Sequence, residues 1–189
     1  MTSGSQSRLR CLSQKSNKKG IVISAGVLDD AGDRMKQKVL FICVHNSARS
    51  QMAAALLNRA CGDLFQAESA GLEPGTLNPL TVEALQEIGI DISQNKTRAV
   101  FDVFKSGELF SYVITVCDEA NAEHCPIFPG VTKRLHWSFR DPASFRGPRQ
   151  ARLEQTRHVR DLIAAKVDEW CAQVSGQSSS ASSRDYGSP

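Results

Sequence analysis

A cysteine, an arginine and a serine form the first group of residues with clear chemical potential. Cys43 ends the apolar run 39–43, and Arg49 and Ser50 follow it after five intervening residues. The next stretch, 51–60, is rich in Ala and Leu and predicts a helix. A strand, a short loop and a helix bring backbone N–H groups and the positive end of a helix dipole to one place. The pattern therefore predicts an anion-binding loop.

The side chains of this loop suit nucleophilic attack on a tetrahedral oxyanion. N–H donors around Cys43 stabilise negative charge on its sulfur, and Ser50 can donate a hydrogen bond to it. The Arg49 guanidinium can bind two oxygens of the anion at once. Asn46 tolerates the positive φ that a tight loop often needs. The alternative is a buried cysteine beside a surface arginine, but the complete pattern favours the catalytic interpretation.

The composition narrows the class of protein. Hydrophobic residues make up 41% of the chain and charged residues 23%, as in globular proteins. The net charge of +3 implies no general attraction to nucleic acid, and no apolar run reaches the roughly 18 residues of a membrane span. Six unevenly spaced cysteines indicate catalytic or redox thiols in a reducing cytoplasm rather than a disulfide scaffold.

Strand and helix patterns alternate along the chain. The predicted strands are 39–43, 64–70, 109–116 and 133–136, and the predicted helices are 51–60, 80–88, 97–104 and 149–173. This alternation predicts an α/β fold, a three-layer sandwich around a central parallel four-stranded sheet. The anion loop would then lie at the carboxyl end of the first strand, where such folds bind ligands.

The two ends of the chain differ in composition from its centre. Residues 1–34 are Ser-rich with several basic residues, which predicts a disordered or non-native extension, with a transit-like arm as the alternative. Met35 would then be the natural start of a single domain, 35–174. The Ser-rich tail, 175–189, is predicted to be disordered.

A second group of residues follows the third predicted strand. Cys117 ends that strand as Cys43 ends the first, so both are expected at one sheet edge, and Cys125 follows after seven residues. The pair can form a disulfide if the segment between them buckles. Two buried small residues, or a zinc site completed by His124, are the alternatives. We assign no such role to Cys61 and Cys171, which are expected to be filler on helix faces.

A third candidate is Asp141, which precedes Pro142. Proline holds the preceding residue extended, and a carboxylic acid above an anion loop can protonate a leaving oxygen. An Asp-Pro pair is also common in simple turns.

The segment from Lys38 to Ala172 resembles the low-molecular-weight protein tyrosine phosphatases and the arsenate reductases built on the same fold. The phosphatases usually have proline after Arg-Ser, whereas Gln51-Met52-Ala53 and the loop Cys43-Val44-His45-Asn46 are similar to the arsenate reductases. The resemblance implies that Cys117 and Cys125 are redox cysteines and that Asp141 is the general acid. Ala143-Ser144-Phe145 replaces the tyrosines of the phosphatases, which argues against phosphotyrosine as the main substrate.

The resemblance also implies a mechanism. Cys43 attacks arsenate, and Asp141 protonates the departing oxygen. Cys117 forms a disulfide with Cys43, Cys125 moves the disulfide outward, and a thioredoxin-like protein reduces it. The residues expected to bind the oxyanion, arsenate or phosphate, are Val44, His45, Asn46, Ser47, Ala48 and Arg49.

No organic cofactor and no metal are expected. Some family members bind potassium beside the loop through its asparagine and an acid of the next helix, but Ala54 stands where that acid would fall. The alternative functions are a phosphatase that hydrolyses phosphate monoesters and a non-catalytic redox sensor or metal-binding module.

Overall fold

Four parallel strands form the central sheet of this computed structural model, in the order β2-β1-β3-β4. The structure describes residues 35–117, 128 and 133–180, and for 176–180 it describes the backbone alone. The strands are β1 Gln37–Cys43, β2 Phe65–Gly71, β3 Tyr112–Thr115 and β4 Lys133–His136. The helices are α1 Arg49–Cys61, α2 Pro79–Gln86, α3 Val100–Lys105, the short 3₁₀ helix η1 Pro142–Ser144 and α5 Arg149–Ser180.

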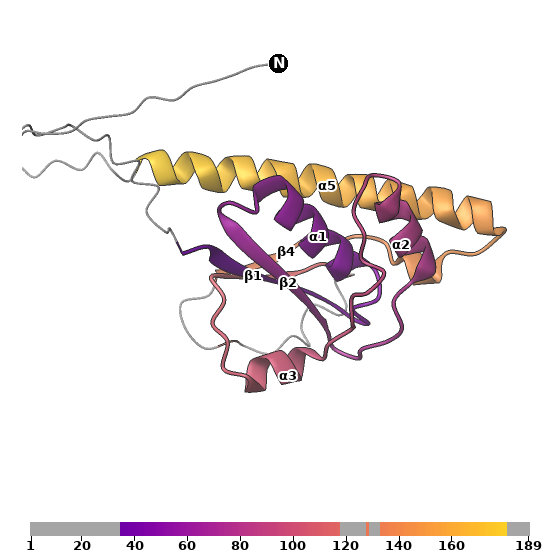
Figure 1. Cartoon of the computed structure of the whole chain (residues 1–189), viewed down its shortest axis with the longest axis horizontal. Coiled ribbons are helices and arrows are strands. Elements are labelled where there is room, and N and C mark those ends of the chain that lie inside the picture. Colours follow the sequence, from indigo (N-terminus) through magenta and orange to yellow (C-terminus); the bar gives the residue numbers. More distant parts are fainter. Residues whose placement is uncertain (1–34, 118–127, 129–132, 181–189) are drawn as a thin grey trace, which may run out of the picture. The chain divides into compact units, whose positions relative to one another are not determined.

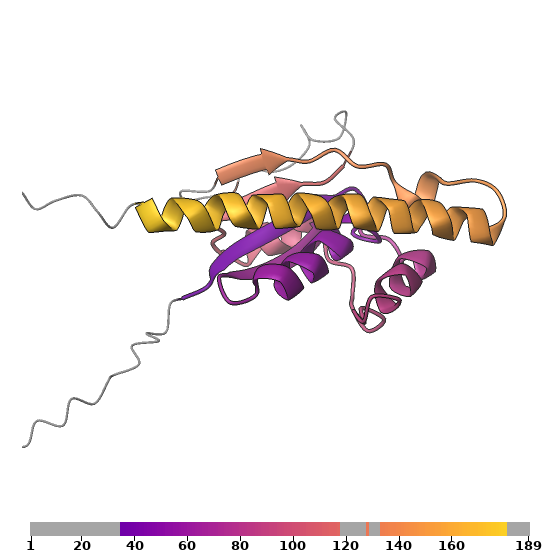
Figure 2. The same cartoon turned by 90° about the horizontal axis from the view of Figure 1, so that it is seen from above.

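Helices cover both faces of the sheet. Helices α1 and α5 lie on one face, with α2 packed against α5, and α3 lies on the other (Figure 1). The view from above shows α5 running along the full width of its layer (Figure 2). This arrangement confirms the predicted three-layer α/β fold with a parallel four-stranded sheet.

The central strand β1 is apolar at successive positions because both of its faces are buried. Val39, Phe41 and Cys43 belong to the core under α1 and α5, whereas Leu40 and Ile42 belong to the core on the α3 side. Side chains alternate between the faces of a strand, so a strand covered on both sides needs apolar residues throughout. This requirement explains the continuous run that the sequence shows before the anion loop.

Strand β1 also lies where the strand order changes direction. The chain moves from β1 to β2 on one side and later returns to place β3 on the other. The loop that follows β1 therefore opens at a topological switch point, the usual ligand-binding position of an open parallel sheet.

The helix boundaries differ in places from those predicted. Helix α2 spans Pro79–Gln86 instead of 80–88, and the chain turns at Gly89 with a φ of 79°. Helix α3 begins at Val100 instead of Thr97. Helix α5 reaches Ser180, so the backbone of 175–180 is helical where disorder was expected. Serine is a modest helix former, and a long helix that is already nucleated can extend through it.

Several predictions lie outside the described residues. They concern the extension 1–34 with its proposed start at Met35, the residues His124 and Cys125, and the tail beyond residue 180. No helix in the described part of the chain is long and apolar enough to cross a membrane.

The prediction for Cys61 and Cys171 was wrong. The two residues form a disulfide that joins the last residue of α1 to α5, with their Cα atoms 6.6 Å apart. They are separated by 110 positions in the sequence. Packing of α1 against α5 brings them together, and neither local segment carries a sign of that contact.

Candidate active site

The anion loop, residues 44–48, has a backbone shape that depends on two residues. Asn46 has a φ of 52°, which confirms the expected positive φ. Gly71 at the end of β2 lies against it, and a Cβ atom there would be 2.7 Å from the Asn46 nitrogen. Only glycine permits this approach of two backbone segments.

The loop is also tied to the segment that follows β2. The carbonyl oxygens of Val44, His45 and Ser47 accept hydrogen bonds from the backbone N–H groups of Glu73 (2.8 Å), Gly75 (2.9 Å) and Asn78 (2.9 Å). These three carbonyl oxygens therefore point toward the 73–78 segment. The N–H groups of the loop can then bind an anion without electrostatic repulsion from these oxygens.

The sulfur of Cys43 lies in a shell of hydrogen-bonding groups. Cys43 is 2% exposed, and its Sγ accepts a hydrogen bond from the Asn46 N–H at 3.1 Å. The Ser50 Oγ lies 3.0 Å from the same sulfur and itself accepts a hydrogen bond from Asn46 Nδ2 at 2.9 Å. A hydroxyl that accepts from the amide can direct its own hydrogen to the sulfur. The expected Ser50–sulfur contact is therefore present.

Arg49 connects the anion loop to the segment that carries Asp141. Its side chain is 3% exposed, Nη2 lies 2.8 Å from Asp141 Oδ2, and Nη1 donates to the Phe139 carbonyl at 3.1 Å. The structure thus brings Arg49 and Asp141 together, although they are 92 positions apart. The guanidinium contacts the Asp141 segment in this state, whereas the sequence predicted only its contact with the anion.

Asp141 is held at the start of a short helix. It caps η1, its Oδ1 accepts a hydrogen bond from the Ala143 N–H at 3.0 Å, and Pro142 is the first residue of the helix. The Asp-Pro pair therefore forms a turn and also supplies a carboxylate to the site. The two interpretations of this motif are compatible.

Cys117 follows β3 at the same end of the sheet as Cys43. The Val116 N–H donates to the Ile42 carbonyl at 2.8 Å, so the chain entering Cys117 runs beside the end of β1. Cys117 is 1% exposed and belongs to the same buried cluster as Cys43. Two of the three proposed redox cysteines are thus at one sheet edge, and Cys125 lies outside the described residues.

Sequence reasoning missed one buried polar side chain of the site. Gln51, in the first turn of α1, is 2% exposed and donates through Nε2 to Asn46 Oδ1 at 3.4 Å. One feature of the sequence could have revealed it, because a glutamine stands among Ala and Met residues at the start of a helix that is predicted to be buried. No group of His, Cys, Asp and Glu within the described ranges is arranged to hold a metal ion.

Comparison with known proteins places this geometry in a family. The family model for low molecular weight phosphotyrosine protein phosphatase matches residues 38–180. Arsenate reductase of Bacillus subtilis (strain 168) is 39% identical over 139 residues, which cover 72% of this chain and 96% of the relative. The crystal structure of arsenate reductase from Archaeoglobus fulgidus is 31% identical with a TM-score of 0.57, covering 70% of this chain and 97% of that one.

A further solved structure, an arsenate reductase in the phosphate binding state, is 25% identical with a TM-score of 0.56. It covers 72% of this chain and 98% of its own. These matches confirm the resemblance that the loop and its following residues indicate. The chain belongs to the low molecular weight phosphotyrosine protein phosphatase family and is a homologue of arsenate reductases.

Proposed function

We propose that the protein reduces arsenate to arsenite through thiol chemistry that begins at Cys43. The observation that carries the proposal is the shell around its sulfur, formed by the Asn46 N–H and the Ser50 hydroxyl. Arg49 and Asp141 lie together beside the same loop. The similarity to arsenate reductases over nearly their whole length supports this choice of reaction.

Anion binding exchanges partners at Arg49. An oxyanion seated on the loop 44–48 competes with the Asp141 carboxylate for the guanidinium, which now bonds that carboxylate at 2.8 Å. Displacement by the anion would release the Asp141 carboxyl from the guanidinium. In this role Asp141 would act as the general acid that delivers a proton to the leaving oxygen.

The chemical steps balance in atoms and electrons. The Cys43 sulfur bonds to arsenic, and one oxygen leaves as water with the Asp141 proton. The Cys117 thiolate attacks the Cys43 sulfur, the sulfur–arsenic electron pair passes to arsenic, and arsenite leaves. The two thiols have then become a Cys43–Cys117 disulfide, while arsenic(V) has become arsenic(III).

The remaining steps return the enzyme to its starting state. Cys125 attacks Cys117, which moves the disulfide to Cys117–Cys125 and frees Cys43. A thioredoxin-like dithiol then reduces this pair by exchange and supplies the two electrons of the cycle. The cycle requires no organic cofactor. This need for a supply of reduced thiol agrees with the cytoplasmic location that the cysteine pattern predicts.

Hydrolysis of phosphate monoesters is the second candidate function. Cys43, Arg49 and Asp141 would act in the same roles, and water would hydrolyse a phospho-cysteine without any second thiol. The family match to phosphotyrosine protein phosphatases favours this candidate. It differs from the reductase in one measurable respect, because it consumes no reductant.

A coupled assay separates the candidates. With reduced thioredoxin as the sole electron donor, we expect one dithiol to be oxidised for each arsenite formed, and none without arsenate. A small phosphate ester serves as the parallel substrate. Ester hydrolysis without arsenate reduction would instead assign the protein as a phosphatase. Thiol oxidation that is independent of arsenate would favour a redox sensor.

A further inference from the structure

Gln51 has every polar atom of its side-chain amide engaged in a buried position. Its Nε2 donates to Asn46 Oδ1 at 3.4 Å and to the Lys96 carbonyl at 3.3 Å, and its Oε1 accepts from Asn95 Nδ2 at 3.0 Å. These bonds connect the anion loop to the segment 95–98. A buried amide with satisfied partners fixes the geometry around it, because a broken bond would leave a desolvated polar atom.

The Asn46 amide has one defined orientation. A backbone N–H can only donate, and the Arg98 N–H lies 2.9 Å from Asn46 Oδ1, so this atom is the oxygen. The opposite end, Nδ2, must then donate to Ser50 Oγ at 2.9 Å. This direction leaves the Ser50 hydrogen available for the sulfur of Cys43, 3.0 Å away.

We propose that Gln51 is a positioning residue that holds Asn46, and through it the Ser50 hydroxyl, in the orientation that supports the Cys43 thiolate. The inference deepens the proposed function and rests on Cys43 being the nucleophile. Gln51 itself touches no reacting atom. It acts by supplying one of the two donors to Asn46 Oδ1 and by bonding Asn95 and Lys96 in the segment that leads to Arg98.

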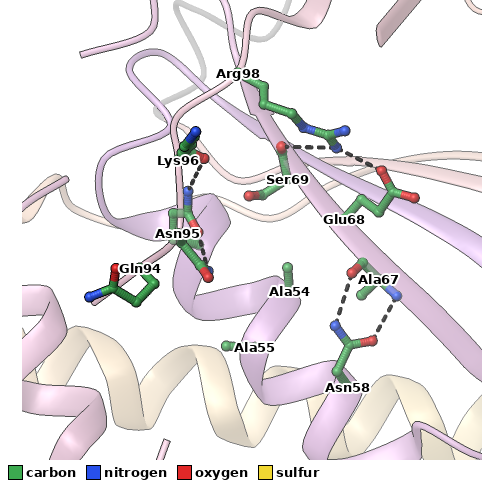
Figure 3. A pocket seen from close by; sticks show the side chains of 11 residues that line it. Ala54, Ala55, Asn58, Ala67, Glu68, Ser69, Gln94, Asn95, Lys96 and Arg98 are labelled. Carbon is green, nitrogen blue, oxygen red and sulfur yellow. Dashed lines mark hydrogen bonds and ion pairs between the residues drawn. The ribbon is translucent and has the colours of Figure 1, made fainter. Parts of the chain in front are cut away.

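The surroundings of Asn46 do not fit the potassium ion that related proteins bind beside the loop. Gln51, Ala54 and Arg98 line a pocket of about 400 Å³ next to it. Asn46 Oδ1 already accepts two hydrogen bonds, and Ala54 offers no oxygen. Figure 3 shows the Arg98 guanidinium reaching Glu68, with which it pairs at 2.6 Å. The N–H groups of Gln51 and Arg98 thus occupy the Asn46 oxygen that would otherwise bind a cation.

The test compares three variants of the full chain. Gln51→Glu keeps the size and the acceptor for Asn95 but cannot donate to Asn46, and Gln51→Ala removes all three bonds. Gln94→Ala is the matched control, because Gln94 lines the same pocket but is exposed, and its side chain bonds only the neighbouring Ser93 hydroxyl among the residues that the structure describes. The first readout is the rate at which iodoacetamide alkylates Cys43 at neutral pH, identified by peptide mass.

We expect both Gln51 variants to slow Cys43 alkylation, and to lower kcat for a small phosphate ester about tenfold with little change in KM, since about one hydrogen bond to the reacting network is lost. Gln94→Ala should behave as wild type. Exchange of sodium for potassium should leave wild-type turnover unchanged. Equal alkylation rates in Gln51→Glu and Gln94→Ala, or strong stimulation of the wild type by potassium, would overturn the proposal.

The alkylation rate separates this inference from the proposed function. It reports the sulfur of Cys43 directly and requires no arsenate. A protein that fails to reduce arsenate but shows slower alkylation in the Gln51 variants would refute the reductase and leave the role of Gln51 standing. A change in KM alone, with kcat and alkylation at wild-type values, would instead assign Gln51 to binding and contradict its positioning role.

Discussion

The two ends of helix α1 each hold a cysteine environment, and they use sulfur in opposite ways. At the start, Cys43 faces the Ser50 hydroxyl and the Asn46 N–H and carries no disulfide. At the end, Cys61 is bonded to Cys171 of α5. Hydrogen-bond donors keep the first sulfur available for reaction, whereas the second sulfur is consumed in a covalent link. The groups packed opposite a cysteine therefore decide which use it serves.

The two environments also differ in how their contacts are distributed along the chain. Cys43, Asn46 and Ser50 lie within one short loop and the first turn of a helix, so their meeting is a local consequence of strand, loop and helix. Cys61 and Cys171 meet only because α1 packs on α5 across the same face of the sheet. Catalytic activity should accordingly depend on the N-terminal end of α1, and the free energy of unfolding on its C-terminal end.

Substitution of Cys43 should produce the largest loss of activity. Cys43→Ser should abolish arsenate reduction and any hydrolysis of phosphate esters, because a hydroxyl is a far weaker nucleophile than a thiolate. Steady-state turnover of both substrates is the measurement, and Cys61→Ser is the matched cysteine control. A Cys43→Ser enzyme that kept even about a tenth of wild-type turnover would be incompatible with the nucleophile assignment.

Substitution of Arg49 should have the next largest effect. Arg49→Lys keeps the positive charge but loses the planar pair of donors that now reaches Phe139 and Asp141. We expect turnover to fall about a hundredfold or more, as when one oriented donor to an oxyanion is removed. Circular dichroism should show an intact fold. Near-normal turnover would mean that the guanidinium only holds the Asp141 segment in place.

Removal of the disulfide should change stability and spare activity. Cys61→Ser should lower the free energy of unfolding by about 5 kcal/mol, as expected for a closed loop of this length, and lower Tm by about 15 °C. Turnover at 25 °C should be unchanged. Cys171→Ser should give the same loss. A reductant should lower the Tm of the wild type but not the Tm of either variant, because the variants have no disulfide to reduce. A loss of turnover in either variant would show that the two ends of α1 are coupled.

A surface charge cluster should give the smallest effect. Hydrogen bonds from Arg157, with Arg160 nearby, lower the pKa of Glu87 at the end of α2. A lowered folded-state pKa stabilises the protein above the unfolded pKa of glutamate, and this stabilisation is lost as pH falls through the folded pKa. Glu87→Gln should therefore cost no more than about 1 kcal/mol at pH 7, because the pair is partly exposed.

Urea unfolding at several pH values tests this last effect. The difference between wild type and Glu87→Gln should shrink toward zero in acid, where Glu87 is protonated in both states. Gln86→Ala provides the control, since Gln86 lies beside Glu87 and its side chain makes an exposed hydrogen bond to Asp91 and none to Arg157 among the described residues. If the difference in free energy of unfolding between the two proteins grew as pH fell, the pH dependence would be opposite to the expected one. That result would contradict the pairing of Glu87 with Arg157.

The sequence was most informative where burial and local geometry dictate residue type. The continuous apolar run of β1 reflects a strand buried on both faces, and Asn46 reflects a positive φ. The predicted strand 133–136 coincides with β4. The order and class of the elements followed from such patterns because each depends on the immediate neighbours of a residue.

Contacts between distant segments could not be predicted in the same way. The Cys61–Cys171 disulfide and the bonds of Gln51 to Asn95 and Lys96 arise from the packing of separate elements. Arg49 and Asp141 are also far apart in the sequence. The sequence assigned both residues to the site but did not predict the bond between them. A single sequence carries no signal of the surface on which two such segments meet.

The most direct test of the central claim is a single turnover of the Cys125→Ser protein with arsenate. Rapid quench measures arsenite per enzyme, and peptide mapping without reductant identifies the linked cysteines. The relay predicts about one arsenite per enzyme and a Cys43–Cys117 disulfide, because no third thiol can move the bond outward. Sustained arsenate reduction by this variant with thioredoxin as the sole donor would contradict the relay.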